Sequence, residues 1–155
     1  MKNTESMTSK LKECACNLSV LYVEDDELVR ESFQGILKNF FKDVKVCTNG
    51  KDALLELMDY HTYDLIISDI EMPQLDGLKM AELIKEKNPK QVIVMMTAHS
   101  DKEYLLQSYK IGIEGYITKP FDSEEDIKTL LRICRKIEKE ESSKVMEWDK
   151  AFSKL

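Results

Sequence analysis

The chain has 155 residues, of which 43% are apolar and 34% are charged, and its formal net charge is −6 at pH 7. This length and composition suit one globular domain with an ordinary core, and the acidic balance argues against a nucleic-acid-binding surface in this chain. No apolar run approaches the ~18 residues of a membrane span, and the polar first ten residues do not resemble a secretory signal. We therefore expect a cytoplasmic protein.

Strand and helix patterns alternate along the chain after a polar segment, residues 1–16, that we expect to be a flexible tail. The strand patterns are short apolar runs rich in β-branched residues, and the helix patterns repeat apolar residues at spacings of three and four. The expected strands are residues 18–23, 44–48, 64–68, 91–97 and 114–118. The expected helices are residues 26–41, 51–60, 78–87, 102–111 and 123–141.

This strict alternation indicates the fold class. Strands that alternate with helices imply right-handed crossovers and a parallel sheet. Strands that are apolar along nearly their whole length, such as residues 91–97, are typical of a sheet covered by helices on both faces. The sequence therefore predicts an α/β protein with a doubly wound parallel sheet.

The four cysteines do not form a recognisable metal or redox motif. Cys14 and Cys16 are separated by one residue and have no second ligand pair, which a zinc site would need. Cys47 and Cys134 lie in amphipathic segments and are typical of small core residues. We expect all four to be reduced and without a function.

Polar residues gather where the predicted strands end, the edge at which open parallel sheets form their sites. Glu24 and Asp25 follow the first strand, Asp69 follows the third, Thr97 ends the fourth and Lys119 follows the fifth. Each alone is typical of a helix cap or turn. Two carboxylates ~4 Å apart, however, repel by roughly 4 kcal/mol at an effective dielectric near 20, so their convergence predicts a bound cation or a shifted pKa. Oxygen ligands beside a phosphate favour Mg²⁺ over Ca²⁺.

These residues resemble the receiver domain of bacterial two-component response regulators. The resemblance rests on Glu24-Asp25, on Asp69 followed by Met72-Pro73 and Asp76-Gly77, on Thr97-Ala98, and on Tyr116 with Lys119-Pro120-Phe121. It covers about residues 17–138, and Glu24 departs from the commonest form, in which a second Asp stands there. It implies a flavodoxin-like (βα)5 fold with strand order 2-1-3-4-5. Residues 139–155 would be a helical extension, or a linker to an output domain that is not present.

The resemblance also implies a mechanism. Asp69 would take a phosphoryl group from a sensor histidine kinase or a phosphotransfer protein. Asp25 and Asp69 would bind Mg²⁺ directly, Glu24 would act through water, and the backbone carbonyl of Glu71 would complete the protein ligands. Lys119 would pair with a phosphoryl oxygen. The protein would be a signalling switch that catalyses only its own phosphoryl transfer and dephosphorylation.

The family also implies a cis peptide bond and roles for further residues around the site. Thr97 would move to bond a phosphoryl oxygen, and Tyr116 would change position with it, although Tyr116 can also be an ordinary strand aromatic. The Lys119-Pro120 peptide bond is expected to be cis. Glu71 and His99 would flank the phosphoryl group and set how fast water reaches it, unless both are merely exposed loop residues.

Two other protein classes share part of this pattern. A haloacid-dehalogenase-like phosphatase also uses an aspartate nucleophile, but it has a second aspartate where this chain has Glu71, and it carries a cap domain. A structural receiver-like module without phosphorylation would lack a member of the acidic pair, Asp69 or Lys119, and all are present.

The last residues carry a weak seven-residue repeat. One seam position is shared by Leu131, Val145 and Phe152, and the other by Ile127, Cys134, Trp148 and Leu155. Glu138 and Glu141 interrupt the seam, which would weaken a coiled coil. The segment is either frayed around Ser142-Ser143 or part of a helix that forms a homodimer.

Overall fold

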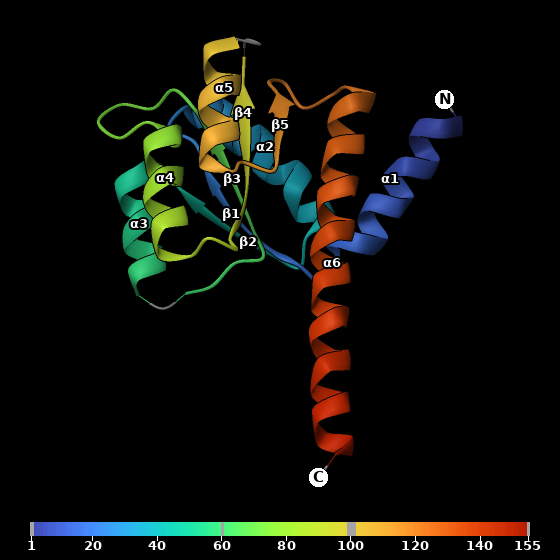
Figure 1. The fold of residues 1–155 in the computed structure, drawn as a ribbon. Coiled ribbons are helices and arrows are strands. Elements are labelled where there is room, and N and C mark those ends of the chain that lie inside the picture. The colour runs from blue at the N-terminus through green and yellow to red at the C-terminus, as the bar shows by residue number, and fades with distance from the viewer. Residues whose placement is uncertain (1, 60, 99–101, 155) are drawn as a thin grey trace.

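Figure 1 shows the computed structural model of the protein, a sheet with helices on both faces and one long helix that projects beyond it. The structure describes residues 2–59, 61–98 and 102–154. The strands are β1 (Ser19–Val23), β2 (Asp43–Cys47), β3 (Leu65–Asp69), β4 (Val92–Thr97) and β5 (Gly115–Thr118). The helices are α1 (Lys2–Ala15), α2 (Glu27–Phe40), α3 (Gly50–Met58), α4 (Gly77–Lys87), α5 (Lys102–Ile111) and α6 (Glu124–Ser153).

The five strands form one parallel sheet in the order β2-β1-β3-β4-β5. This confirms the predicted fold class and strand order. The register pairs Val23 of β1 with Ser68 of β3, and Asp69 of β3 with Met96 of β4. The carboxyl ends of the three central strands therefore lie side by side, and the residues that follow them meet at one edge of the sheet.

Side chains alternate between two cores, one on each face of the sheet. Val20 and Tyr22 of β1 pack with side chains of α1, α2 and α6, whereas Leu21 and Val23 pack with side chains of α3 and α4. Every residue of β3 is buried, as expected for a central strand covered on both faces. The two cores explain why the strands are apolar along nearly their whole length.

Side-chain caps fix where four of the helices begin. Asp26, Asn49, Asp76 and Ser123 each accept a hydrogen bond from the backbone N–H three residues later, with donor–acceptor distances of 2.7 to 3.1 Å. Each cap satisfies an N–H that the first helical turn leaves without a partner. The caps at Asp26 and Asp76 set the start of the helices that follow the site-bearing strands β1 and β3.

The prediction of a flexible tail over residues 1–16 is wrong. Residues 2–15 form α1, which lies beside the first half of α6 (Figure 1), and the side chains of Leu11 and Ala15 are fully buried. These two residues are one helical turn apart and share a face, so α1 gains its stability from packing on the domain. The polar composition of the segment conceals this short apolar stripe.

The long helix α6 continues without a break through Ser142 and Ser143, so the expectation of a frayed segment there is wrong. Their hydroxyls bond to the carbonyl oxygens of Glu138 and Lys139 one turn earlier, at 3.1 and 3.0 Å, a contact that a helix accommodates. At the other end, Asp126 accepts two hydrogen bonds from Thr118, from its N–H at 2.9 Å and its hydroxyl at 2.7 Å. The first turn of α6 is thereby attached to the end of β5.

Among the helices described, none combines the length and the apolar character needed to cross a lipid bilayer.

Candidate functional site

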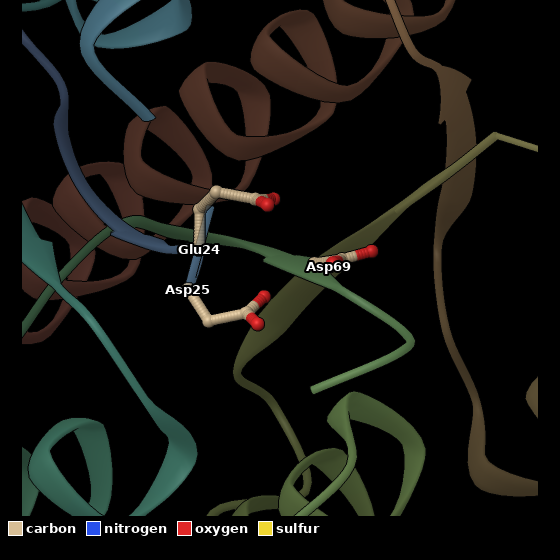
Figure 2. Close-up of side chains that lie close together, drawn as sticks. All are labelled: Glu24, Asp25 and Asp69. Carbon is tan, nitrogen blue, oxygen red and sulfur yellow. The ribbon is translucent and has the colours of Figure 1, made fainter. Parts of the chain in front are cut away.

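Three carboxylates meet at the carboxyl edge of the sheet. Glu24 and Asp25 directly follow β1, and Asp69 is the last residue of β3. Figure 2 shows their carboxylates directed into the same space, and one oxygen of each lies within 4.8 Å of the others. Glu24 is fully buried and Asp69 is 6% exposed, whereas Asp25 is exposed. The predicted convergence of these three residues is therefore present in the fold.

Lys119 supplies a positive charge to this cluster. Its ammonium nitrogen lies 2.9 Å from Asp69 Oδ2 and 3.0 Å from Glu24 Oε2. The loop that carries it begins at the end of β5, and the Lys119-Pro120 bond is cis, as predicted. With all groups ionised, one ammonium beside three carboxylates leaves a net charge of −2.

The donor set fits a hard divalent cation. All three candidate ligands offer oxygen atoms, and the buried Glu24 Oε2 has the ammonium of Lys119 beside it but no well-aligned hydrogen bond among the described residues. Mg²⁺ prefers oxygen ligands that together carry surplus negative charge. The cluster is therefore suited to Mg²⁺, with Glu24, Asp25 and Asp69 as the side chains available to hold it.

Burial makes the ionised form of the cluster costly. It raises the pKa of both Asp69 and Glu24, even though hydrogen bonds from Lys119 act in the opposite direction. Burial lowers the pKa of Lys119, but its bonds to the two carboxylates outweigh this and leave that pKa above its ordinary value. Lys119 is therefore charged at neutral pH, and a bound dication would relieve the remaining repulsion.

We expect stability without metal to fall as the pH rises, and Mg²⁺ to reverse that fall. The folded-state pKa values of Asp69 and Glu24 are raised above the ~3.9 and ~4.3 of an unfolded chain. Protonation of these two carboxyl groups therefore stabilises the folded state. This stabilisation is complete at a pH below the unfolded-state pKa values and is lost as the pH rises through the folded-state pKa values. Mg²⁺ at a hundred times its dissociation constant should then add about 2.7 kcal/mol at neutral pH. Urea unfolding with Mg²⁺ or EDTA at several pH values measures both effects, and a metal-independent midpoint at neutral pH would contradict the expectation.

The other predicted residues line the same space. A cavity of about 250 Å³ at this edge is lined by Thr97 and Glu71 together with the acidic cluster and Lys119. Thr97 ends β4, directly beside Asp69 of β3 in the order of the sheet. His99, the other residue expected to flank the site, lies outside the described residues.

Tyr116 lies half-buried on β5 and is bonded to α5. Its hydroxyl donates to the backbone carbonyl of Tyr104 at 2.8 Å and is in close contact with the hydroxyl of Ser108. The Ser108 hydroxyl donates to the same carbonyl at 2.7 Å. Tyr116, the predicted switch residue, therefore has specific polar partners on the neighbouring helix, as the hydroxyl of a half-buried tyrosine usually does.

Two residues near the site were missed from the sequence. Arg30, on the first turn of α2, donates to the backbone carbonyls of Glu24 and Asp25 at 3.1 and 3.2 Å, and so fixes the loop that carries the acidic pair. Its position in the first turn of the helix that follows the acidic pair was a signal of this role that the sequence offered. Tyr104 donates from its hydroxyl to Glu71 Oε1 at 3.2 Å. No sequence pattern indicates this bond, because it depends on how α5 packs beside the loop after β3.

A comparison with known protein families matches residues 20–132 to the response regulator receiver domain. The chain belongs to this family. The receiver's relatives include the chemotaxis protein CheY of Halobacterium salinarum, which is 36% identical over 102 residues that cover 66% of this chain and 84% of CheY. The DNA-binding transcriptional regulator NtrC of Salmonella typhimurium is 30% identical over 128 residues, which cover 83% of this chain and 27% of NtrC. This receiver chain thus spans about a quarter of the length of the NtrC regulators it matches.

Solved receiver structures agree with the fold. The N-terminal domain of an uncharacterized protein from Wolinella succinogenes superposes with a TM-score of 0.68 at 29% identity, covering 82% of this chain and 98% of that one. A CheY-like receiver domain protein from Methanospirillum hungatei gives a TM-score of 0.72, covers 80% of this chain and 98% of that one, and at 22% identity supports the fold alone. The match over residues 20–132 confirms the predicted family, whose members in general are phosphorylated on an aspartate and use Mg²⁺.

Proposed function

We propose that this receiver accepts a phosphoryl group on Asp69 from a histidine kinase or a phosphotransfer protein. The observation that carries the proposal is the position of the Lys119 ammonium, 2.9 Å from Asp69 Oδ2 and in contact with Glu24. An aspartate at the end of a central strand, beside a lysine and further carboxylates, is arranged as a nucleophile with its charge stabilisers in place. Asp69 also lines a cavity, which gives a donor access to it.

Each residue then has a part in the transfer. An Asp69 oxygen forms a bond to phosphorus as the bond from phosphorus to the donor nitrogen breaks, and the leaving imidazole keeps that electron pair. Asp25, Asp69 and the backbone carbonyl of Glu71 would hold Mg²⁺, with Glu24 acting through water, and the ion supplies neutralisation of the phosphoryl charge. Lys119, already beside Asp69, pairs with a phosphoryl oxygen as a compact point charge.

Two more side chains would read the modified state. Thr97 lines the same cavity as Asp69, so its hydroxyl can hydrogen-bond to a phosphoryl oxygen. Tyr116 lies on the strand next to that of Thr97 and is bonded to α5. New contacts to the phosphoryl group exist only in the modified protein and would therefore bias a two-state equilibrium.

Acetyl phosphate with Mg²⁺ tests the proposal. One phosphoryl group per chain is expected by intact mass spectrometry, it should map to Asp69, and EDTA should prevent it. Steady multiple turnover of a generic phosphate ester would instead favour a haloacid-dehalogenase-like phosphatase. Absence of both labelling and Mg²⁺ binding would favour a receiver-like module without phosphorylation.

The proposed setting is the cytoplasm, where the protein acts as a switch and not as an enzyme on other substrates. All four cysteines are free within the described structure, and Cys47 and Cys134 are buried. Burial raises the pKa of Cys134 to about 12, which keeps it as an unreactive thiol. Free cysteines are usual in a reducing compartment.

We further propose that the projecting part of α6 forms an antiparallel homodimer. Trp148 and Phe152 are 65% and 64% exposed, and their ring centroids are 5.9 Å apart. They follow the buried Cys134 and Leu131 at multiples of seven residues and so lie within about 60° of the side that faces the domain. A partner helix that ran parallel on that side would collide with the globular domain of the first protomer. An antiparallel partner helix would instead extend away from that domain.

An alternative dimer contact could use the acidic residue just before β5, but that residue, Glu114, is already engaged within the chain. Glu114, just before β5, pairs with Lys85 at 2.6 Å and accepts a hydrogen bond from the Ile93 N–H at 2.7 Å. Its carboxylate is therefore committed to its own domain and is not available for an ion pair with a second chain. This favours a contact through α6.

Truncation after Glu141 is expected to convert a dimer into a monomer at micromolar concentration. Truncation removes Trp148 and Phe152, the exposed aromatic residues that the partner helix would cover. Sedimentation velocity of the full chain and the truncated chain, with and without beryllofluoride, measures the change. Replacement of the exposed Met146, which lies on the opposite side of α6, by Ala is the matched control and should leave the dimer intact. Equal monomer masses for both chains would refute the α6 dimer.

A further inference from the structure

The polar contacts of Tyr104 extend from the site to the switch residue. Its hydroxyl donates to Glu71 Oε1 at 3.2 Å. Its backbone carbonyl accepts hydrogen bonds from the hydroxyls of Tyr116 at 2.8 Å and Ser108 at 2.7 Å. Ser108 is buried and Tyr104 is half-buried, so the bonds to the Tyr104 carbonyl are partly shielded from water, whereas the bond to the exposed Glu71 is open to it. One residue of the first turn of α5 thus contacts both the loop after Asp69 and the side chain of Tyr116.

Glu71 stands between two cavities, which makes the orientation of its carboxylate consequential. It lines the cavity of about 250 Å³ that contains Asp69 and Lys119. It also lines a second cavity, of about 460 Å³, whose walls include Tyr104. The bond to Tyr104 holds the Glu71 carboxylate toward α5. Without the bond, the exposed carboxylate would be free to turn toward a site that already has surplus negative charge.

We infer that Tyr104 is a positioning residue that holds the Glu71 carboxylate away from incoming phosphoryl donors and couples it to the hydrogen bonds of Tyr116. The inference rests on the proposed phosphorylation of Asp69. Phosphoryl donors are anions, so a fourth carboxylate directed into the site would repel them. Because the same residue accepts the hydrogen bond of Tyr116, a movement of the loop at Glu71 would also reach the switch residue through the first turn of α5.

Tyr104→Phe removes the hydroxyl and keeps the ring and the backbone carbonyl. We expect it to slow labelling by acetyl phosphate with Mg²⁺ about threefold to tenfold, the effect of losing one exposed hydrogen bond of ordinary net strength. High salt should reduce the defect, because it screens exposed charges. In a Glu71→Gln background the same substitution should have no effect, since no carboxylate remains to turn. Tyr109→Phe, on the same helix and 86% exposed, is the matched control.

A merely structural role would give a different pattern. It would lower the urea midpoint of Tyr104→Phe and slow labelling equally in the Glu71→Gln background and at all salt concentrations. Equal labelling rates for the wild type and Tyr104→Phe would likewise overturn the inference. Failure of the wild type to be labelled at all would overturn both this inference and the proposed function, and so is distinct from either result.

The link to Tyr116 has its own readout. In protein labelled with fluorotyrosine, the Tyr116 resonance, assigned with Tyr116→Phe, should shift when beryllofluoride and Mg²⁺ are added. That shift should be smaller in Tyr104→Phe, which has lost the bond to Glu71. An identical shift in both proteins would refute the coupling, even if the effect on labelling were present.

Discussion

Asp69→Asn is expected to abolish phosphoryl labelling by acetyl phosphate and Mg²⁺, a loss of about 10³-fold or more, as when other catalytic nucleophiles are removed. The amide has nearly the shape of the carboxylate but is a poor nucleophile, and it cannot hold Mg²⁺ with a negative charge. Lys119 would keep its other partner, Glu24, at 3.0 Å, so the loop after β5 should stay in place. Intact mass spectrometry against time gives the rate.

The same substitution should make the metal-free protein more stable at neutral pH. Burial raises the pKa of Asp69, so its ionised form is unfavourable in the folded state and its removal relieves repulsion within the cluster. The urea midpoint in EDTA should therefore rise while labelling disappears. Asp76→Asn is the matched control, because Asp76 is an exposed helix cap and Asn caps equally well. Labelling of Asp69→Asn at the wild-type rate would place the phosphoacceptor elsewhere.

Gly77→Ala should destabilise the fold by about 3 kcal/mol, at the upper end for an overpacked site. A Cβ at Gly77 would lie 2.0 Å from the carbonyl oxygen of Asp69 and 3.1 Å from the Cα of Ile70. Both are backbone atoms, so no side-chain movement can make room. The Gly77 N–H also donates to the Ile70 carbonyl at 2.8 Å, which keeps the start of α4 against the end of β3. Urea unfolding measures the loss.

Gly35→Ala is the control for the effect of adding a methyl group. Gly35 is exposed on α2 and a Cβ there would meet nothing within 4 Å. Alanine should stabilise that helix by up to ~1 kcal/mol. If both substitutions changed the urea midpoint alike, the close approach at Gly77 would not govern stability. We also expect slower labelling of Gly77→Ala, because the clash falls on the backbone of Asp69, the proposed phosphoacceptor.

Gly77 illustrates a requirement that local sequence does not reveal. A positive φ would explain a glycine in a turn, but among the described residues positive φ values occur at Gln74 and Gly112 and not at Gly77. The requirement is instead the contact between α4 and the end of β3. Such a contact depends on two elements that are eight residues apart and is not visible in local sequence.

The position of the candidate site was predictable because a parallel sheet brings the carboxyl ends of its strands to one edge, however the helices pack. Once Asp69 and Lys119 are placed at strand ends, topology puts them at the same edge of the sheet, with only β4 between their strands. The directions of individual side chains could not be predicted from the topology of the sheet. The bond between Tyr104 and Glu71 depends on the rotation of α5, and the packing of α1 depends on two small contacts, Leu11 and Ala15, within a polar segment.

The attachment of α6 to β5 makes the long helix a mechanical lever. Thr118, bonded to Asp126 at 2.9 and 2.7 Å, directly precedes Lys119. A displacement of this strand end would therefore be passed to the first turn of α6 through these two bonds. The helix continues for 16 residues past Ile137, from Glu138 to Ser153, or about 24 Å. A tilt of about 10° at the domain would therefore move the far end by about 4 Å.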